Sequence, residues 1–394
     1  MKNIIKTILF LFVVAVAVCA CDDDNRSDST PVVKYVRSTD AAASDSLLVS
    51  ASMGQTIAII GEGLEDVVSV IFNDQTAKLN PVYVTSSSIV VTIPGTIPEV
   101  VSNTFTLNTA NGKSTVYDFI VVITSPQPES ISCEWAPDGS TATIYGNYFF
   151  AREDGSIDVL FPGNLEATVS FFDETSVTVT VPEGSLAGYI TITNDYGTGR
   201  SQFIFRDETG IFIDGENPSV WNNRGLSAFD STEGIDGQYV KFDGTTGAWA
   251  WPANALQLFY INPENTQLVS EGEVSDYALK FECYCHEWHD TPLLVWFSND
   301  DDTHNVDGED AQYHWRPYLN NGTAENFVTD GWITVTMPLE DFVYNKDESE
   351  TTRAISGLDK LQNLNMMWFG AIQDGSTEFG LNVWIDNVRL VKIN

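Results

Sequence analysis

A sequence pattern that recurs 85 to 89 residues further along the chain constrains its fold more than any other feature. Each copy has a Gly after an apolar segment, then an apolar segment with a Phe, an alternating segment ending in Pro, and a final Gly. The matched positions are Gly61 and Gly146, Phe72 and Phe161, Pro94 and Pro182, and Gly112 and Gly197. A nearly constant offset across four landmarks indicates a duplicated module whose loops differ slightly in length.

Short alternating segments separated by Gly, Asn and Pro make up both copies. In Val177-Thr-Val-Thr-Val181, apolar and hydroxyl residues alternate, as they do in a strand with one buried face. About seven such strands in about ninety residues predict an immunoglobulin-like sandwich for each copy. We place the first sandwich at residues 31–124 and the second at residues 125–206.

Residues 207–394 differ from the two copies in their aromatic content. They contain nine of the ten tryptophans, and only Trp135 lies elsewhere. The nine are Trp221, Trp249, Trp251, Trp288, Trp296, Trp315, Trp332, Trp368 and Trp384. Ser, Thr, Val and Gly are abundant throughout the chain and helix-forming runs are scarce, so this part is also expected to be all-β, with a very aromatic core or with aromatic residues on its surface.

Alternation predicts which way some of these rings point. In the segment 279–288, the apolar positions Leu279, Phe281, Cys283 and Cys285 form one face. Tyr284 and Trp288 then lie on the opposite face, because successive side chains in a strand alternate. In the next segment, 293–298, the same reasoning turns Trp296 outward. If the two segments pair as a hairpin, these three rings share one exposed sheet face.

Exposed aromatic rings of this kind suit sugars, whose C–H bonds stack on a ring while their hydroxyls meet nearby polar groups. Trp249 and Trp251 flank a turn at Gly244–Gly247 and are two residues apart, so they face the same way. Trp315 lies near a loop and is predicted to cap the same face. The candidate glycan-binding residues are therefore Trp249, Trp251, Tyr284, Trp288, Trp296 and Trp315. The alternative for each ring is a place in the core; Trp332 is interpreted as structural, and Trp384 is left open.

The charge balance excludes several classes of ligand. The chain has 55 Asp and Glu against 19 Lys and Arg, for a formal net charge of −36. Binding of nucleic acids requires clustered Lys and Arg on the protein. Anionic membranes and polyanionic substrates would be repelled by the negative electrostatic field of the protein. A neutral ligand is expected.

The first residues have the pattern of a targeting segment. Lys2 and Lys6 precede an apolar run, which ends at Cys19-Ala-Cys21. This pattern predicts a secretory signal at residues 1–20, and it resembles a bacterial lipobox with Cys21 as the lipidated residue. The acidic residues that follow predict a tether at 21–30. Ordinary secretion, with Cys21 as a bystander, is the alternative.

The sequence favours neither a metal site nor a catalytic site. The acidic run 299–310 offers oxygen ligands for calcium but lacks the spacing of an EF-hand, and His286 and Glu287 alternate to opposite faces, which disfavours zinc. No pair of carboxylates is singled out for glycoside hydrolysis, and no Gly-x-Ser-x-Gly elbow is present. We expect no metal, no cofactor and no enzymatic activity.

Two resemblances bring these observations together. The Gly61-Glu-Gly-Leu64 turn, the strand that ends at Phe72-Asn73 and the closing strand-Pro element resemble the IPT/TIG family over residues 31–206. The lipobox, the paired repeats, Gly331-Trp-Ile-Thr-Val-Thr-Met-Pro-Leu339 and Trp384-Ile-Asp-Asn-Val-Arg-Leu390 together resemble a surface glycan-binding lipoprotein of a polysaccharide utilisation locus.

The second resemblance implies a fold and a function. Residues 207–394 would be a jelly-roll sandwich similar to a xyloglucan-binding-type domain, following two IPT/TIG spacers. The protein would sit on the outer membrane and capture a β-glucan or a xyloglucan-like hemicellulose for an outer-membrane importer and its glycan-binding partner lipoprotein. In the family a Trp and an adjacent aromatic pair bind the glucan backbone. Here Trp249 or Trp251 with Tyr284 fits best, but Cys283 and Cys285 flank Tyr284 in place of the pair. A secreted glycoside hydrolase and an adhesin that binds a protein partner are the alternatives.

Overall fold

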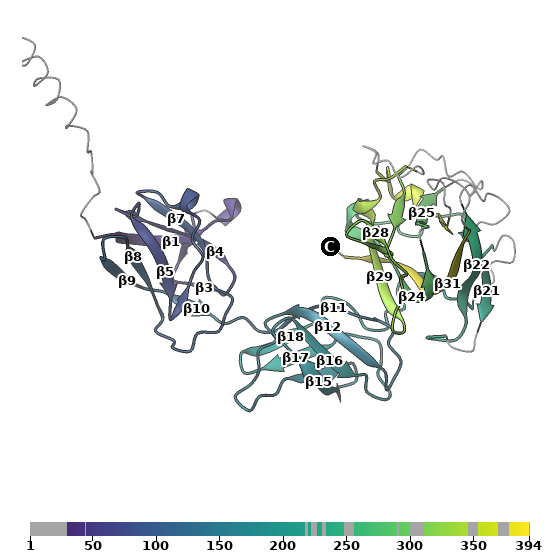
Figure 1. Ribbon diagram of the computed structural model, residues 1–394, viewed down its shortest axis with the longest axis horizontal. Coiled ribbons are helices and arrows are strands. Elements are labelled where there is room, and N and C mark those ends of the chain that lie inside the picture. The colour runs from purple at the N-terminus through teal and green to yellow at the C-terminus, as the bar shows by residue number, and fades with distance from the viewer. Residues whose placement is uncertain are drawn as a thin grey trace, which may run out of the picture. The chain divides into compact units, whose positions relative to one another are not determined.

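The chain is almost entirely β-strand, which confirms the predicted all-β class. A computed structural model describes residues 30–393 except for 44, 217–219, 222–226, 231–233, 248–255, 290, 300–310, 346–353 and 369–377. It divides into two compact units between Thr124 and Ser125 (Figure 1). The 3-10 helices are η1 (Ala41–Ala43), η2 (Pro81–Tyr83), η3 (Val274–Asp276), η4 (Leu339–Asp341) and η5 (Leu358–Lys360). None of the helices in these residues is long and apolar enough to cross a membrane.

The first unit is a sandwich of two four-stranded sheets. One sheet has the order β2 (Leu47–Leu48), β1 (Val32–Ser38), β4 (Thr56–Glu62) and β7 (Ser88–Thr92). The other has the order β6 (Gln75–Thr76), β5 (Val67–Phe72), β8 (Thr104–Thr109) and β9 (Ser114–Asp118). A short parallel pair joins β3 (Ser50–Ser52) to β10 (Ile120–Val122). Ile57 and Ile59 alternate into the core, where the rings of Phe72 and Phe105 lie 5.4 Å apart.

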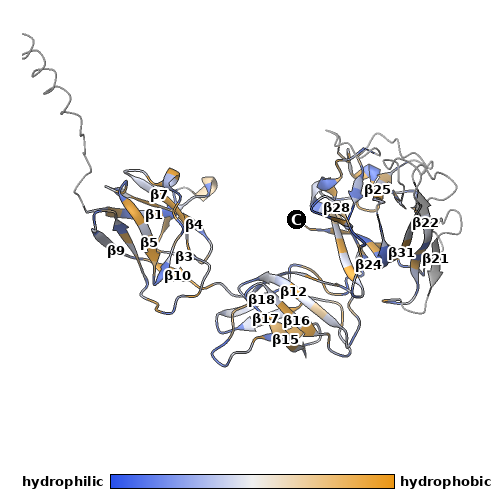
Figure 2. Cartoon of the chain, in the orientation of Figure 1, coloured by the Kyte–Doolittle hydropathy of each residue, from blue (hydrophilic) through white to orange (hydrophobic). Residues whose placement is uncertain are grey.

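The second sandwich repeats this plan within the second unit. One sheet has the order β11 (Gln127–Ile131), β12 (Thr141–Asn147), β16 (Ser176–Thr180) and β15 (Thr168–Phe172). The other has the order β14 (Leu165–Glu166), β13 (Asp158–Phe161), β17 (Thr191–Asn194) and β18 (Gly197–Arg200). Figure 2 shows apolar and hydrophilic residues interspersed along the same strands, as expected for strands with one buried face.

The matched glycines of the two copies have one structural cause. A Cβ atom at Gly61 would lie 2.0 Å from the carbonyl oxygen of Val32, and one at Gly146 would lie 2.0 Å from that of Gln127. In both sandwiches the pairing of the first strand with the strand that carries the glycine is interrupted by a β-bulge. The close approach at the bulge leaves no room for a side chain, so the same residue type recurs.

The C-terminal sandwich also has two sheets. The β24 sheet has the order β21 (Ser227–Asp230), β22 (Tyr239–Gly247), β31 (Glu378–Lys392), β24 (Tyr277–Trp288) and β29 (Ile333–Pro338), and β19 (Ile211–Ile213) also pairs with β31. The β25 sheet has the order β20 (Val220–Trp221), β23 (Leu256–Tyr260), β30 (Asn363–Trp368), β25 (Leu293–Ser298) and β26 (Tyr313–Trp315). The hairpin of β27 (Leu319–Asn320) and β28 (Thr323–Ala324) lies outside both sheets.

Segments 279–288 and 293–298 do not pair as a hairpin, which was the condition for Tyr284, Trp288 and Trp296 to share one sheet face. β24 pairs with β31 and β29, whereas β25 pairs with β30 and β26, so the chain crosses from one sheet to the other after Trp288. A β-bulge between Cys285 and Glu287 also shifts the alternation along β24. Trp288 therefore points into the core between the sheets, fully buried, with its ring 5.4 Å from that of Trp368.

Buried charges join the second sandwich to the C-terminal one. Glu134, in the loop after β11, accepts hydrogen bonds from Arg389 (2.8 Å) and Lys280 (2.5 Å). Arg389 also donates to both oxygens of Glu282, at 2.6 and 3.0 Å. Thr334 accepts from the Glu134 backbone N–H at 2.6 Å and donates to Glu282 at 2.9 Å. These five residues form the charged joint, in which each carboxylate has a cationic partner.

Candidate functional site

An aromatic cluster lies on the outer face of the β24 sheet, the face that points away from the core. Neighbouring strands place its members together, because Tyr284 on β24 is directly opposite Trp384 on β31, which in turn is opposite Lys241 on β22. Trp332 enters the cluster from the residue before β29, with its ring 5.9 Å from that of Tyr284. The cluster, called the sheet-face cluster, consists of Tyr239, Tyr284, His286, Trp332 and Trp384.

Trp384 is the centre of the sheet-face cluster. It stacks on Tyr239 with ring centroids 4.7 Å apart and an interplanar angle of 25°, and it meets the edge of Tyr284 at 5.2 Å. Its indole N–H donates to the Asn382 side chain at 2.9 Å, and the Lys241 ammonium lies 5.7 Å from the ring centroid. Only 5% of Trp384 is exposed, so it supports the neighbouring rings and is not itself an open platform.

The accessible parts of the cluster belong to other members. Tyr284, His286 and Trp332 are half-buried, and the His286 ring lies 4.3 Å from Trp384 and 4.1 Å from Tyr284. The Nε2 atom of His286 is buried and has no hydrogen-bond partner among the described residues. Partly open rings beside imidazole and amide groups can stack on a sugar and bond its hydroxyls.

The structure separates the tryptophans that alternation had grouped. Of the predicted glycan-binding residues that the structure describes, only Tyr284 lies on the outer face of the β24 sheet. Trp296 is on the β25 sheet, 4% exposed, with its ring 6.5 Å from Phe259. Trp315 is half-buried and meets the edge of Trp288 at 5.0 Å, so it packs against the core. Trp249 and Trp251 lie outside the described residues.

Sequence reasoning missed most of the sheet-face cluster. The interpretation of Trp332 as structural agrees with its packing against the core of the second sandwich, although this ring also reaches the cluster; Trp384 is a member that the sequence assigns to neither class, and both follow the alternation rule. Trp384 precedes the buried Ile385, and Trp332 precedes the partly buried Ile333. The alternation of β31 and β29 with these apolar neighbours was the available signal. His286 is two residues after Tyr284, so alternation also predicts it on the outer face, whereas no sequence signal singles out Tyr239.

The titratable groups near the cluster do not support metal binding or covalent chemistry. Burial raises the pKa of Cys285 to about 12 and that of Cys283 well above its ordinary value, so both thiols stay protonated and cannot act as thiolate ligands or nucleophiles. Across the described residues, no three His, Cys, Asp or Glu side chains are grouped to hold a metal. The calcium candidates Asp300, Asp302 and Asp307 lie outside that part of the chain. Cys21, the predicted lipidation site, also lies outside it.

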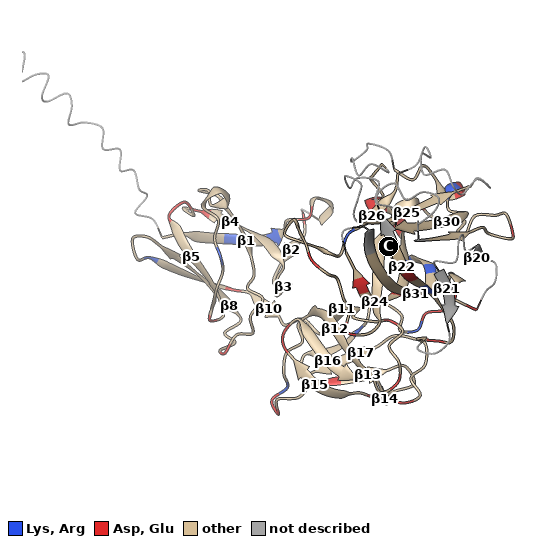
Figure 3. Ribbon diagram, turned by 45° about the vertical axis from the view of Figure 1, so that its right-hand side comes forward, with Lys and Arg blue, Asp and Glu red and all other residues tan. Residues whose placement is uncertain are grey.

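Acidic residues are distributed over the described chain, and two lysines lie near the sheet-face cluster (Figure 3). Figure 3 shows Asp and Glu spread over the loops and strands of the described chain. Lys280, on the same strand as Tyr284, is bonded to Glu134 in the charged joint. Lys241 is the cation that contacts the sheet-face cluster.

Comparison with family models matches two parts of the chain. Residues 205–392 match the model described as "Surface glycan-binding protein B xyloglucan binding domain", and residues 46–121 match the IPT/TIG domain. The first match spans the whole C-terminal sandwich with the sheet-face cluster, and the second covers most of the first sandwich. Both agree with the resemblances inferred from the sequence.

Known proteins show the same similarity. The crystal structure of the surface glycan-binding protein PbSGBP-B from Prevotella bryantii is 26% identical, with a TM-score of 0.65, and the match covers 93% of this chain and 99% of that one. An SGBP-B from a complex xyloglucan utilization locus in Bacteroides uniformis is 19% identical over 92% of this chain and all of that one, with a TM-score of 0.46. An IPT/TIG domain-containing protein from Bacteroides ovatus is 30% identical over 192 residues, which are 43% of this chain and 38% of that relative.

Proposed function

We propose that the chain binds a neutral polysaccharide at the cell surface without cleaving it, because its residues 205–392 match the xyloglucan-binding domain of surface glycan-binding protein B. The proposed ligand is a β-glucan or a xyloglucan-like hemicellulose. The proposed binding surface is the outer face of the β24 sheet, centred on Tyr284 and Trp332, and Trp249 and Trp251 remain proposed contacts.

One observation carries this proposal more than any other. The matched family region coincides with a sandwich in which five adjacent aromatic rings lie on one sheet face. Ring faces and edges recognise the C–H surface of a pyranose, and they need no charge to do so. The net charge of −36 disfavours anionic glycans. A neutral polysaccharide is therefore the ligand class that is compatible with both the aromatic rings and the negative charge of the protein.

Binding without cleavage agrees with the groups around the cluster. Hydrolysis of a glycosidic bond requires two carboxyl groups that flank the bond. Two carboxyls on the cluster's own strands, Glu282 and Asp386, are 0% and 1% exposed, and Glu282 is bonded to Arg389, so neither is open to a sugar on the outer face. The domain is therefore treated as a binding domain and not as a glycoside hydrolase.

Anchoring and supply belong to the same proposal. We propose that Cys21 carries the lipid at the outer membrane, that residues 31–206 act as spacers, and that the captured glycan passes to an outer-membrane importer and its glycan-binding partner lipoprotein. Replacement of Cys21 with Ala should release the protein into the soluble fraction. Retention of the Cys21→Ala variant in the outer membrane would contradict the anchor.

A glycan array combined with a reducing-sugar assay tests the function. The proposal predicts binding to neutral β-glucans and no release of reducing ends from any bound glycan. Release of reducing ends would favour the glycoside hydrolase, and an array with no glycan bound would favour the adhesin.

A further inference from the structure

One sheet of the second sandwich has no charged side chain on its two central strands, β12 and β16. The side chains that alternate inward from these strands, such as Ile144 and Val177, are fully buried. The outward side chains all bear hydroxyl groups: Thr141, Thr143 and Tyr145 on β12, and Ser176, Thr178 and Thr180 on β16. In a chain with a net charge of −36, such a face can contact a neutral ligand without the cost of desolvating a charge.

Two exposed aromatic rings lie on this face. Tyr145 is 47% exposed, and Phe171, on the edge strand β15, is 57% exposed. Phe171 is directly opposite Thr178, which is opposite Thr143, two residues before Tyr145. Residues opposite one another share a face, and so do residues two apart in a strand. The two rings therefore flank β16 on the same side of the sheet, which is called the hydroxyl face together with the outward side chains of β12 and β16.

A β-bulge in β15 turns Phe171 onto the hydroxyl face. The register against β16 shifts between Val169 and Phe171, and the inserted residue changes which side chain points outward. A pocket of about 410 Å³ adjoins the Phe171 ring. Its lining comes from residues 155–157 and 169–172, includes two Ser and two Phe, and contains no charged residue. The hydroxyl face thus ends in an uncharged hollow beside an exposed ring.

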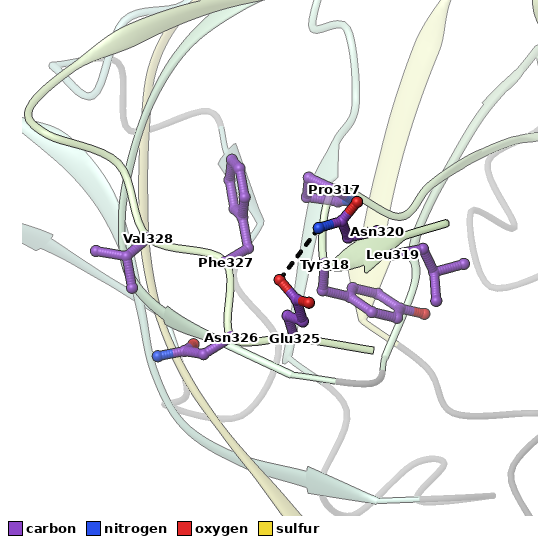
Figure 4. A pocket seen from close by; sticks show the side chains of 8 residues that line it. All are labelled: Pro317, Tyr318, Leu319, Asn320, Glu325, Asn326, Phe327 and Val328. Atoms are coloured by element: carbon purple, nitrogen blue, oxygen red, sulfur yellow. Dashed lines mark hydrogen bonds between the residues drawn. The ribbon is translucent and has the colours of Figure 1, made fainter. Parts of the chain in front are cut away.

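The pocket beside the β27–β28 hairpin differs from this one in the state of its rings (Figure 4). It measures about 370 Å³, and its aromatic rings belong to Tyr318 and Phe327. Both rings pack near Trp288 of the core, at centroid distances of 6.3 and 6.2 Å, and Tyr318 is only 6% exposed. These rings stabilise the C-terminal sandwich, whereas about half of each ring residue on the hydroxyl face is exposed.

Backbone hydrogen bonds join the hydroxyl face to the C-terminal sandwich. Ser132 follows β11, and its side chain accepts the backbone N–H of Thr143 at 3.0 Å. The Ser132 carbonyl accepts the N–H of Thr334, on β29, at 2.9 Å. Trp332, two residues before Thr334, belongs to the sheet-face cluster and also packs against the core of the second sandwich. The two surfaces therefore belong to one compact unit, residues 125–394.

We propose that the hydroxyl face is a second glycan-binding surface, which contacts the same neutral polysaccharide that the sheet-face cluster holds. The inference rests on the proposed function and goes beyond it, because residues 125–204 lie outside both family matches and were assigned only a spacer role. Tyr145 and Phe171 stack on the C–H surfaces of pyranose rings. The Ser and Thr hydroxyls between them donate and accept hydrogen bonds with sugar hydroxyls.

Two surfaces on one unit make the affinity depend on the length of the glycan. A long polysaccharide reaches both surfaces, and its second contact forms within the complex at a high effective concentration. A short oligosaccharide occupies the sheet-face cluster and gains nothing from the hydroxyl face. Loss of the second surface therefore lowers the affinity for the polysaccharide and not the affinity for the oligosaccharide.

Titration calorimetry with the full-length protein tests the second surface, with soluble xyloglucan and a short xyloglucan oligosaccharide as probes. Phe171→Ala and Tyr145→Ala should each lower the polysaccharide affinity about tenfold and leave the oligosaccharide affinity unchanged. The matched control is Tyr83→Ala, which removes a ring that is 54% exposed on η2 of the first unit, and it should change neither affinity. Because all three rings are exposed, the melting temperature should stay at the wild-type value in each variant.

The outcomes separate this inference from the proposed function. Unchanged polysaccharide affinity in both Phe171→Ala and Tyr145→Ala, or equal losses for the two probes, would overturn the second surface while leaving glycan binding intact. A wild type that binds neither these probes nor any other neutral β-glucan would overturn the proposed function, and the second surface with it.

Discussion

At the scale of single residues, position on β24 decides whether an aromatic ring stabilises the fold or is available to a ligand. Tyr284 and Trp288 are four residues apart on the same strand, yet Tyr284 is half-buried on the outer face and Trp288 is fully buried between the sheets. The bulge between Cys285 and Glu287 separates their environments. The two residues therefore make a matched pair for mutagenesis.

The first prediction contrasts these two positions. Trp288→Ala should cost about 3–5 kcal/mol of unfolding free energy, because it opens a cavity in the core. Tyr284→Ala should change stability far less but weaken glycan binding about tenfold; stacking of bases on aromatic rings contributes about 1–3 kcal/mol by alanine substitution, and we expect a similar value for a sugar. Chemical denaturation and calorimetry of both variants provide the check. A large stability loss in Tyr284→Ala with unchanged glycan affinity would show that this ring stabilises the fold and does not contact the glycan.

A second prediction at this scale concerns Asp386, whose pKa is raised to about 8 by burial, with Glu282 adding to the shift. An unfolded Asp titrates near 3.9, so the folded state binds more protons between these values and loses stability as pH rises through them. Asp386→Asn mimics the protonated form. Its unfolding free energy should match the wild type below pH 4 and exceed it by a growing margin up to pH 8. A difference that stays constant from pH 4 to pH 8 would show that Asp386 is not held protonated.

Single-residue environments were predictable from the sequence only where alternation was regular. The rule placed Leu279, Phe281 and Cys283 in the core and Tyr284 on the other face, as the structure does. It failed at Trp288, because a bulge depends on the partner strand, β31, about a hundred residues away in sequence. No local feature of the segment 279–288 predicts the β-bulge between Cys285 and Glu287.

At the scale of strands, β24 and β31 carry the charged joint on the same outer face as the sheet-face cluster. Burial lowers the pKa of Arg389, but the carboxylates of Glu282 and Glu134 outweigh it and raise that pKa above its usual range. The guanidinium is thus held charged, with no exposed surface. Loss of Arg389 would leave the buried Glu282 carboxylate without its cationic partner, and an uncompensated buried charge is strongly destabilising.

The third prediction follows from that arrangement. Arg389→Ala should lower the unfolding free energy by about 3–5 kcal/mol, the usual cost of breaking a buried ion pair. The control is Arg152→Ala, which removes an ion pair with Asp158 whose side chains are 24% and 41% exposed, and it should cost about 1 kcal/mol or less. Urea denaturation of both variants measures the difference. Equal losses would show that the joint contributes no more than a surface pair.

Strand pairing was the element-level feature that the sequence left ambiguous. The connection after Trp288 is short enough for a hairpin, and the predicted shared face required one, but the same length also lets the chain cross between sheets. Trp296 consequently lies on the β25 sheet opposite Asn365. The repeat, in contrast, was predictable from the sequence. At both Gly61 and Gly146 the close approach of a backbone carbonyl leaves no room for a Cβ atom, so the same requirement selects glycine in both copies.

At the scale of the whole molecule, the second sandwich and the C-terminal sandwich form one compact unit, residues 125–394. Besides the charged joint, Trp332 packs against the core of the second sandwich. The division into three sandwiches at 31–124, 125–206 and 207–394 thus remains a proposal about domains, while stability is shared across residue 206. Within the charged joint, Glu134 is 146 residues from Lys280 and 255 residues from Arg389, separations at which pairing of charges has no local signal.

The fourth prediction concerns truncation. A protein of residues 125–394 should unfold in a single transition and bind glycan like the full-length chain. Residues 207–394 alone should unfold at a lower temperature, because Lys280 and Arg389 lose the Glu134 carboxylate that contacts them. Scanning calorimetry compares the two. Equal melting temperatures would mean that the second sandwich is only a spacer.

The most direct test of the account is a calorimetric titration of the full-length protein with a neutral soluble xyloglucan at low and at physiological ionic strength. The Debye length falls from about 30 Å to about 8 Å between 0.01 M and 0.15 M salt, which screens charge interactions but leaves stacking and hydroxyl bonds nearly unchanged. The account predicts saturable binding with closely similar affinity at both salt concentrations. An absence of binding, or an affinity that falls steeply with salt, would contradict aromatic recognition of a neutral polysaccharide.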